Sequence, residues 1–333
     1  MSEKNVKLME LINEGKTCNE ICHILNISNK QLFNTLTDLK NNGLFYRRKY
    51  YSNGSIVYSP ITSSDNLSNF SKKKNSIITT HKERELKVLV ISDLHFGNKL
   101  ERLDLVDRAY NYCIKHTIHI IFCCGDLIDG PFTHGEQTLN NLHSQIEHFI
   151  KDYPFDENIL TFGVGGEHDI DAFRKKALNI IEMLRNYRHD IIIGSYGNAF
   201  INIKNDRIHL FHKIDGRKYN PMNSPISLHG HFHRYKVDTK NSDRLDIIIP
   251  SLSNVNQSSP SAIQMNFQFN QNGFINSVYL KQVCFGDEDY ILTEEKYDIT
   301  INKDIETTKI LNEENEVFES CQQIDGQKVL KKN

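Results

Sequence analysis

The sequence predicts an α/β fold in two parts, a layered domain with two sheets over residues 86–285 and a small α+β domain over residues 1–60. In the larger part, apolar strand-like runs alternate with helical periodicity up to residue 188, and strand-like runs alone follow. In the smaller part, helical segments lead into an Asn-Gly hairpin signal.

The N-terminal segment contains the strongest local signals. Apolar residues from Val6 to Ile12 predict a first helix. Thr17 with Glu20 and Ser28 with Gln31 have the spacing of capping boxes, which predicts the starts of a second and a third helix. Two β-rich runs, 44–51 and 55–58, flank Asn53-Gly54 and predict a hairpin.

The larger domain is expected to begin with strands at 86–92, 118–124 and 159–164 and helices at 103–115, 136–151 and 170–188. Further strands are predicted at 191–193, 199–204, 207–211, 226–229, 245–249, 262–269 and 274–283. This order favours a layered domain with helices around a two-sheet centre.

Charge separates the remaining segments. Residues 1–85 carry 13 Lys and Arg against 8 Asp and Glu, a charge of +5, whereas residues 286–333 carry 6 against 13, a charge of −7. Residues 61–85 are rich in Ser and Lys with little periodicity, which predicts a linker. Residues 286–333 are expected to form an acidic tail with local structure or disorder.

Cysteine usage and hydropathy indicate a cytoplasmic chain with no membrane partner. The seven cysteines are odd in number, and no pair is spaced as CxxC. No stretch approaches the roughly 18 apolar residues that a membrane span requires, and the N-terminus has no apolar signal segment.

Metal-binding residue types recur where predicted strands end. The segments are Asp93-Leu94-His95, Gly125-Asp126-Leu127-Ile128-Asp129, Gly165-Gly166-Glu167-His168-Asp169, His212, and His229-Gly230-His231-Phe232-His233. Ligands converge beyond the carboxyl ends of strands in α/β sheets. Carboxylates with neutral imidazoles suit divalent transition metals, and two such ions can share a carboxylate.

The order of these segments resembles the pattern of the calcineurin-like metallophosphoesterases, DxH…GDxxD…GNH(D/E)…H…GHxH, between Asp93 and His233. The resemblance implies one metal held by Asp93, His95 and His233, and a second held by Glu167, His212 and His231, with Asp126 between them. It also implies that a hydroxide between the metals attacks phosphorus. His168 would assist the leaving oxygen, Asp169 would orient its imidazole, and Asp129 would hold a ligand in place.

One ligand position has a rival, and another departs from the family pattern. His209 competes with His212 for the second metal, and the position of His212 at the strand end favours it. Glu167 stands where the family pattern has asparagine, and it brings a charge and no hydrogen-bond donor. A less positive site penalises a singly charged diester less than a doubly charged monoester; alternatively, Glu167 lowers turnover.

The N-terminal pattern of three helices and a hairpin resembles a winged helix-turn-helix domain. In that family the third helix enters the major groove and the wing contacts the DNA backbone. The resemblance implies DNA-binding residues Lys30, Gln31, Asn34, Arg47, Arg48 and Lys49. A protein-docking module of the same shape remains the alternative.

Together these patterns predict a metal-dependent phosphodiesterase or nuclease with two divalent ions, manganese before iron or zinc, directed to DNA by residues 1–60. One alternative is a DNA-binding regulator with a non-catalytic phosphoesterase domain that senses metal or nucleotide. A second alternative is an enzyme acting on a small nucleotide or a phosphoprotein, with a docking domain.

Overall fold

Two sheets form the centre of the larger domain. The computed structural model describes residues 3–41, 44, 46–60, 76–79, 84–131, 137–215, 219, 224–239, 244–255, 260–285 and 288–299. The side chains of Lys30, Arg47 and Arg48 lie outside this description, as do residues 300–333. All described residues belong to one unit, Met1–Ile299.

The first sheet has a parallel centre. Its order is β15-β14-β13-β4-β5-β6-β7, and β4 to β7 run parallel while β13, β14 and β15 add in antiparallel fashion beside β4. The bounds are β4 Glu85–Ile91, β5 Ile120–Cys123, β6 Leu160–Gly165, β7 Ile191–Tyr196, β13 Ala262–Phe269, β14 Ile275–Phe285 and β15 Asp289–Asp298. The parallel strands therefore end on one edge of the sheet.

The second sheet has the order β11-β12-β10-β9-β8-β3-β1-β2. Its bounds are β1 Tyr46–Tyr51, β2 Ile56–Pro60, β3 Ser76–Thr79, β8 Asn198–Ile203, β9 Asp206–Phe211, β10 Ile226–His229, β11 Lys236–Asp238 and β12 Leu245–Ile248. β9, β10 and β12 run parallel, so β9 and β10 also end on one edge.

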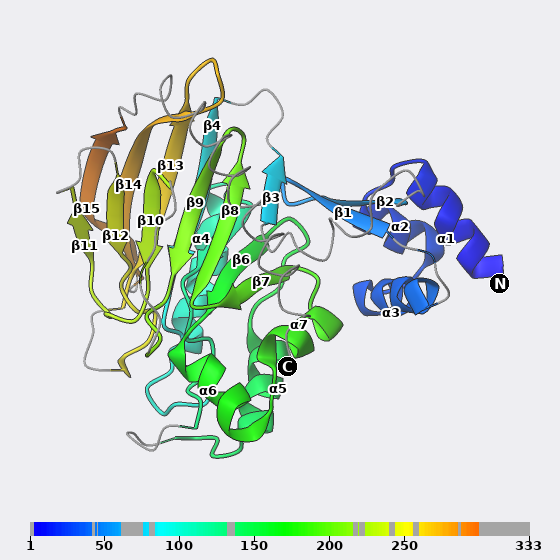
Figure 1. Ribbon diagram of the computed structural model, residues 1–333, viewed down its shortest axis with the longest axis horizontal. Coiled ribbons are helices and arrows are strands. Elements are labelled where there is room, and N and C mark those ends of the chain that lie inside the picture. Colours follow the sequence, from blue (N-terminus) through cyan, green and yellow to red (C-terminus); the bar gives the residue numbers. More distant parts are fainter. Residues whose placement is uncertain are drawn as a thin grey trace, which may run out of the picture. The chain divides into compact units, whose positions relative to one another are not determined.

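The strands of the two sheets are labelled in Figure 1, and alternation along them decides which side chains pack between the sheets. In β4, Val88 and Val90 join the core between the two sheets, where Leu210 of β9 also lies. Leu89 and Ile91 point to the opposite face and join the core beneath the helices. Both faces of β4 are thus buried, which explains its continuous apolar run.

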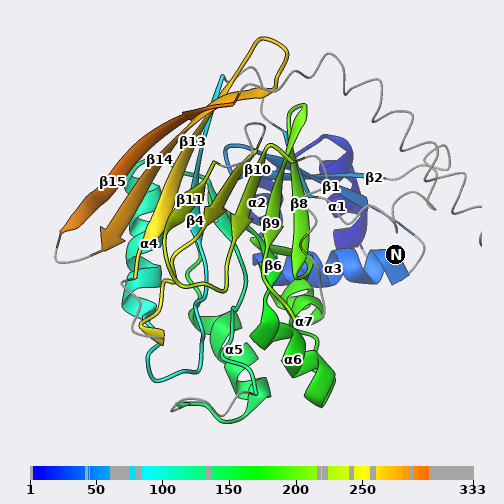
Figure 2. The same ribbon diagram turned by 60° about the vertical axis from the view of Figure 1, so that its left-hand side comes forward.

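Four helices belong to the larger domain (Figure 2), among the described residues: α4 Leu103–Lys115, α5 Leu142–Asp152, α6 Glu167–Lys176 and α7 Ile180–Tyr187. The single helix predicted at 170–188 is wrong. The chain leaves the helix at Ala177, whose φ is +55°, and Asn179 caps α7 by accepting a hydrogen bond from the Glu182 amide. A left-handed residue followed by an N-cap ends one helix and starts another.

The N-terminal segment forms α1 Glu3–Asn13, α2 Cys18–Leu25, α3 Asn29–Asn41 and the β1–β2 hairpin, where they were predicted. The Thr17 hydroxyl accepts from the Glu20 amide at 3.2 Å, and the Glu20 carboxylate accepts from the Thr17 amide at 2.8 Å. Ser28 and Gln31 make the same reciprocal pair. Both capping boxes predicted from the sequence are therefore present.

The hairpin is continuous with the second sheet. β3 pairs in parallel with β1 on one side and with β8 on the other, so the segment predicted as a linker at 61–85 contains a strand. Tyr50 of β1 packs edge-on against Phe162 of β6, with ring centroids 5.4 Å apart. Asn19 of α2 donates to the Glu157 carbonyl at 3.4 Å. The N-terminal domain is thus packed on the larger one.

Within the predicted acidic tail, residues 289–298 form β15. β15 pairs with β14 along its length, and the half-buried Thr293, Glu295 and Tyr297 alternate with exposed residues. Two of these three residues are polar, so the sequence offers little apolar alternation by which to find the strand. The rest of the predicted tail, from residue 300, lies outside the described residues.

The described residues contain neither a membrane-spanning helix nor a disulfide. None of the described helices is long and apolar enough to cross a membrane. The six cysteines in the described part of the chain are free thiols, and Cys123 and Cys124 are buried at the end of β5.

Candidate metal centre

The predicted site residues follow the carboxyl ends of five strands. Asp93 and His95 follow β4, Asp126 follows β5, and Glu167 and His168 follow β6. His212 follows β9, and His231 and His233 follow β10. Because these strands end at neighbouring edges of the two sheets, the loops meet and bring the side chains together.

Backbone hydrogen bonds join the first two loops. The Asp93 amide donates to the Gly125 carbonyl at 2.9 Å, and the Leu94 amide donates to the Asp126 carbonyl at 2.9 Å. The Asp129 amide returns a bond to the Phe96 carbonyl at 2.9 Å. The pairing of β4 with β5 therefore continues past the strand ends and fixes the two loops in register.

The ligand-bearing loops use unusual backbone conformations. Asp93, His95, Asp126, His231 and His233 all have φ between +50° and +80°. Non-glycine residues seldom adopt this left-handed region, and such strain gathers at functional sites. Gly166 shows how tightly the loops pack, because an added Cβ would lie 2.1 Å from Asp126 Oδ1.

Three groups of side chains could each hold a metal ion among the described residues: Asp93, His95 and His233; Asp126, His212 and His231; and His95, Asp126 and His168. In the first group, His95 Nε2 lies 3.4 Å from His233 Nε2, and His233 Nε2 lies 3.4 Å from Asp93 Oδ1. In the second, His212 Nε2 lies 3.0 Å from Asp126 Oδ2. Asp126 belongs to the second and third groups, and His95 belongs to the first and third, so the three groups share residues.

Hydrogen bonds behind the imidazoles fix which nitrogen faces each group. His212 Nδ1 donates to the Cys124 carbonyl at 2.7 Å, and His233 Nδ1 donates to the Val255 carbonyl at 3.2 Å. A carbonyl can only accept, so in the neutral rings Nε2 carries the lone pair. Backbone carbonyls commonly orient metal-binding histidines in this way.

The donor set fits a divalent transition metal. His212 Nε2 is buried and, despite its 3.0 Å distance from Asp126, has no hydrogen bond of acceptable geometry in the described structure. Two ring nitrogens facing each other at 3.4 Å, from His95 and His233, also suit a shared cation. Carboxylate oxygens with imidazole nitrogens are ligands that manganese, iron and zinc accept.

The electrostatics of the cluster favour ionised carboxylates. Burial raises the pKa of Asp126, but the neighbouring imidazoles of His212 and His168 lower it more, so it lies well below its usual range. Burial lowers the pKa of His95 and keeps that ring neutral, the form that binds metal. For His212, burial lowers the pKa, but Asp126 and further partners raise it to about 10.

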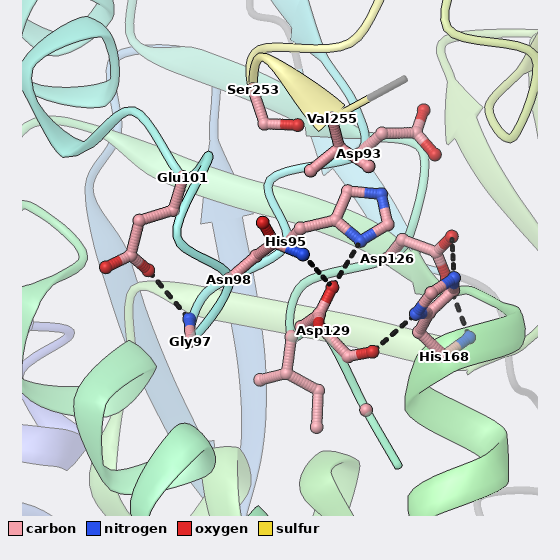
Figure 3. A network of polar contacts seen from close by, with 12 residues as sticks. Asp93, His95, Gly97, Asn98, Glu101, Asp126, Asp129, His168, Ser253 and Val255 are labelled. Carbon is pink, nitrogen blue, oxygen red and sulfur yellow. Dashed lines mark hydrogen bonds and ion pairs between the residues drawn. The ribbon is translucent and has the colours of Figure 1, made fainter. Parts of the chain in front are cut away.

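Asp129 lies behind the first group (Figure 3). Its Oδ1 is 3.5 Å from His95 Nδ1 and accepts from Asn98 Nδ2 at 2.9 Å, and its Oδ2 accepts from Gln137 Nε2 at 2.6 Å. It therefore contacts the ring of a candidate ligand, as the sequence predicted. Asn98 and Gln137 were missed, since no spacing in the sequence links them to Asp129.

Asp169 was expected to orient the imidazole of His168, and this prediction is wrong. Its carboxylate accepts from the backbone amides of Gly166 at 2.7 Å and of Leu127 and Ile128 at 3.1 Å, which ties the start of α6 to the Asp126 loop. The Asp129 carbonyl accepts from His168 Nδ1 at 2.5 Å and orients that ring (Figure 3). A backbone acceptor carries no residue-type signal, so the sequence could not reveal it.

Glu167 and His209 are the two contested positions. Glu167 Oε2 lies 3.7 Å from His231 Nδ1, with its side chain 20% exposed, but none of the candidate groups found in the described residues contains it. His209 is buried away from these groups, where it contacts Asn198 Oδ1 at 2.9 Å and stacks on Phe200. The structure therefore favours His212 over His209.

Comparison with known proteins supplies a family. Residues 86–286, more than half of the chain, match the model of the calcineurin-like phosphoesterases. No curated protein matches the chain.

Solved structures with some similarity include Yfce, a phosphoesterase from E. coli (14% identity, covering 65% of this chain and 100% of that one, TM-score 0.40). Others are a dimetal phosphatase from Danio rerio (10% identity, 64% and 99%, TM-score 0.40) and the nuclease MPE of Pseudomonas putida (14% identity, 62% and 87%, TM-score 0.34).

Metal binding is expected to release about one proton at pH 7. Asp126 helps to raise the pKa of His212 to about 10, so this ring must lose a proton before its Nε2 can bind a metal ion. Below that pKa the metal competes with the proton, so the apparent affinity should rise by up to about tenfold per pH unit. Calorimetric Mn²⁺ titrations in buffers of different ionisation enthalpy measure the release. A pH-independent affinity without proton release would contradict it.

Proposed function

The chain belongs to the calcineurin-like phosphoesterase family and is a hydrolase that acts on phosphate esters, and we propose that it cleaves phosphodiesters with two divalent metal ions. The observation that carries the proposal is the position of Asp126, which belongs to two of the candidate metal groups and joins them into one centre. When bound, two metal ions supply an activated water and polarise the phosphate.

In this proposal the ligand side chains hold the ions in a fixed arrangement. Asp93, His95 and His233 would hold one ion, and His212 and His231 would hold the other. Asp126 groups with His212 and His231 and also with His95, so it is proposed to lie between the two ions. All except His231 are at least about nine-tenths buried. Buried ligands oriented by carbonyl acceptors exclude water and need little rearrangement when a substrate binds.

His168 is proposed as the general acid. Its ring is oriented by the Asp129 carbonyl, and its Nε2 lies 3.9 Å from Asp126 Oδ2, at the edge of the centre. Burial lowers the pKa of His168, but Asp126 and the Asp129 carbonyl raise it more, so it lies above its ordinary value. A ring that stays protonated near neutral pH can give its proton to the leaving oxygen.

Glu167 is the basis for preferring diesters. Its carboxylate adds a negative charge beside His231, in a centre that already holds Asp93 and Asp126. Burial raises the pKa of Glu167, as do the nearby Asp215 and Asp126. An additional charge repels a doubly charged monoester more than a singly charged diester.

DNA is the substrate class proposed from the N-terminal domain. Gln31 and Asn34 on α3 and Lys49 on β1 are exposed, which supports a contact surface of the expected kind. The amide oxygen of Gln31 already accepts from the Ser28 amide at 2.9 Å and from the Ser28 hydroxyl at 3.3 Å, so its amino group is the part left to read a base. Manganese is the metal we expect first.

A docking domain is the second candidate, and the hairpin favours it. β1 is paired on both sides, by β2 and β3. At the hairpin turn, an added Cβ on Gly54 would lie 2.0 Å from the Asn158 carbonyl oxygen, so the turn abuts the loop after α5. A wing held in this way has less freedom to follow a DNA backbone.

Asp126→Ala is expected to lose both metal content and hydrolysis of bis-(p-nitrophenyl) phosphate, because the carboxylate proposed to lie between the two ions is removed. His168→Ala should keep its metal and lose about 10²- to 10⁴-fold in kcat, the usual contribution of a general acid. Elemental analysis and steady-state kinetics measure the two effects. Loss of metal in the His168 variant would show that His168 is a ligand. Wild-type protein that binds metal without turnover would favour the regulator.

Glu167→Asn is expected to raise kcat/KM for p-nitrophenyl phosphate relative to bis-(p-nitrophenyl) phosphate, because one negative charge leaves the centre. Glu157→Gln is the matched control, since that exposed residue lies in the loop after α5. The ratio of the two kcat/KM values is compared in the three proteins. An unchanged ratio in the Glu167 variant would mean that its charge does not reach the substrate.

The full-length protein, without metal so that it cannot cleave, is expected to bind mixed-sequence duplex DNA at low salt, and Arg47→Ala with Arg48→Ala should weaken binding to all duplexes. One or two phosphate contacts give a shallow salt dependence, with log K falling by about 0.9 per contact per log unit of salt. Lys30→Ala should instead reduce any sequence preference. Fluorescence anisotropy across a NaCl titration tests this. If the protein does not bind DNA at about 50 mM salt, residues 1–60 are better explained as a docking domain.

A further inference from the structure

His148 on α5 bridges two carboxylates outside the candidate metal groups. Its Nδ1 lies 2.7 Å from Asp152 Oδ2, and its Nε2 lies 3.1 Å from Glu101 Oε1. The side chains of His148 and Glu101 are each 17% exposed. The imidazole also packs on Phe96, with ring centroids 5.3 Å apart. The bridge therefore connects α5 to the loop that follows β4.

His148 lies between carboxylates from two different parts of the chain. Asp152 is one turn further along α5, whereas Glu101 belongs to the loop after β4. Through its second nitrogen the His148 ring therefore restrains the Glu101 side chain against α5.

Glu101 passes this restraint to the metal-site loop. Its Oε2 accepts from the Gly97 amide at 2.7 Å (Figure 3). Gly97 lies two residues after His95 and has a φ of +95°. The next residue, Asn98, donates to Asp129, whose carboxylate faces the His95 ring. Glu101 therefore acts on the turn that carries both His95 and Asn98.

The same face of α5 also holds the second loop. Gln145, one turn before His148, accepts from the Gly130 amide at 2.8 Å and donates to the Leu139 carbonyl at 2.7 Å. Gly130 directly follows Asp129. An added Cβ on Gly97 would lie 2.6 Å from Gln145 Cγ, so this side chain touches the turn at Gly97 as well.

We propose that Glu101 and His148 are positioning residues for the metal centre: the His148 ring holds the Glu101 carboxylate on the Gly97 amide and so sets the place of His95. The inference rests on the proposed metal function. Neither side chain belongs to a candidate metal group of the described residues. Their effect reaches the metal only through the loop, as expected of groups behind a ligand.

The test compares Glu101→Ala, Glu101→Gln and His148→Gln with His143→Gln in the full chain. His143 lies on the same helix and pairs with Glu147 at 3.2 Å, but both side chains are more than half exposed and contact neither loop. Calorimetric titration with Mn²⁺ gives the metal affinity. Hydrogen–deuterium exchange of metal-free protein gives the protection of the segment around Gly97.

Glu101→Ala is expected to lower metal affinity by on the order of tenfold, the lower end for partners behind a ligand, and to speed exchange at Gly97. Glu101→Gln should be milder, because its amide oxygen can still accept from Gly97. His148→Gln should fall between Glu101→Gln and the control.

Measurements on the wild-type protein distinguish failure of the proposed metal function from failure of the positioning role. If the wild-type protein binds no metal, the proposed function fails, while faster exchange at Gly97 in Glu101→Ala still supports the restraint. If the wild type binds metal and the Glu101 and His148 variants match His143→Gln in affinity and exchange, the positioning role is wrong. A lower melting temperature with unchanged affinity and Gly97 exchange would likewise assign these residues to general stability alone.

Discussion

The buried carboxylate of Asp126 is the contact on which the rest of the centre depends. Its Oδ1 accepts from the His168 amide at 2.9 Å, which fixes the start of α6, and its Oδ2 lies 3.0 Å from His212 Nε2 at the end of β9. One side chain thus ties loops from both sheets together. Gly166 has to be glycine for this, since a Cβ there would occupy the place of the carboxylate.

Assembling this centre costs free energy that the fold must offset. Five of the candidate ligands have a left-handed backbone, and several carboxylates and imidazoles lie buried beside one another. The apolar cores on both faces of β4 and the backbone hydrogen bonds between the loops offset this free-energy cost. Without metal, the proton on His212, whose pKa is raised to about 10, balances part of the carboxylate charge. The site is therefore ready for cations before any ion binds.

The hairpin of the N-terminal domain belongs to the second sheet of the larger domain, so the two domains are not joined by a linker alone. β3 inserts between β1 and β8 and makes the hairpin part of the second sheet. The loop after α5 contacts α2 through Glu157 and the hairpin turn through Asn158, while the helix itself holds the metal-site loops through Gln145 and His148. The helix α5 and the loop that follows it therefore contact the metal-site loops and the N-terminal segment, respectively.

The sequence by itself determined the elements with local signals and most of the candidate metal ligands. Capping boxes, the Asn-Gly hairpin and apolar strands depend on neighbouring residues, and the ligands follow strand ends, where α/β sheets gather them. Only the tertiary structure decided what depends on distant partners. β15 is held by the backbone of β14, and the chain turns at Ala177 between two helices. Carbonyl oxygens orient His168 and His212, and Asp169 binds backbone amides. Backbone groups are the same at every residue, so no sequence pattern can show which of them a side chain will meet.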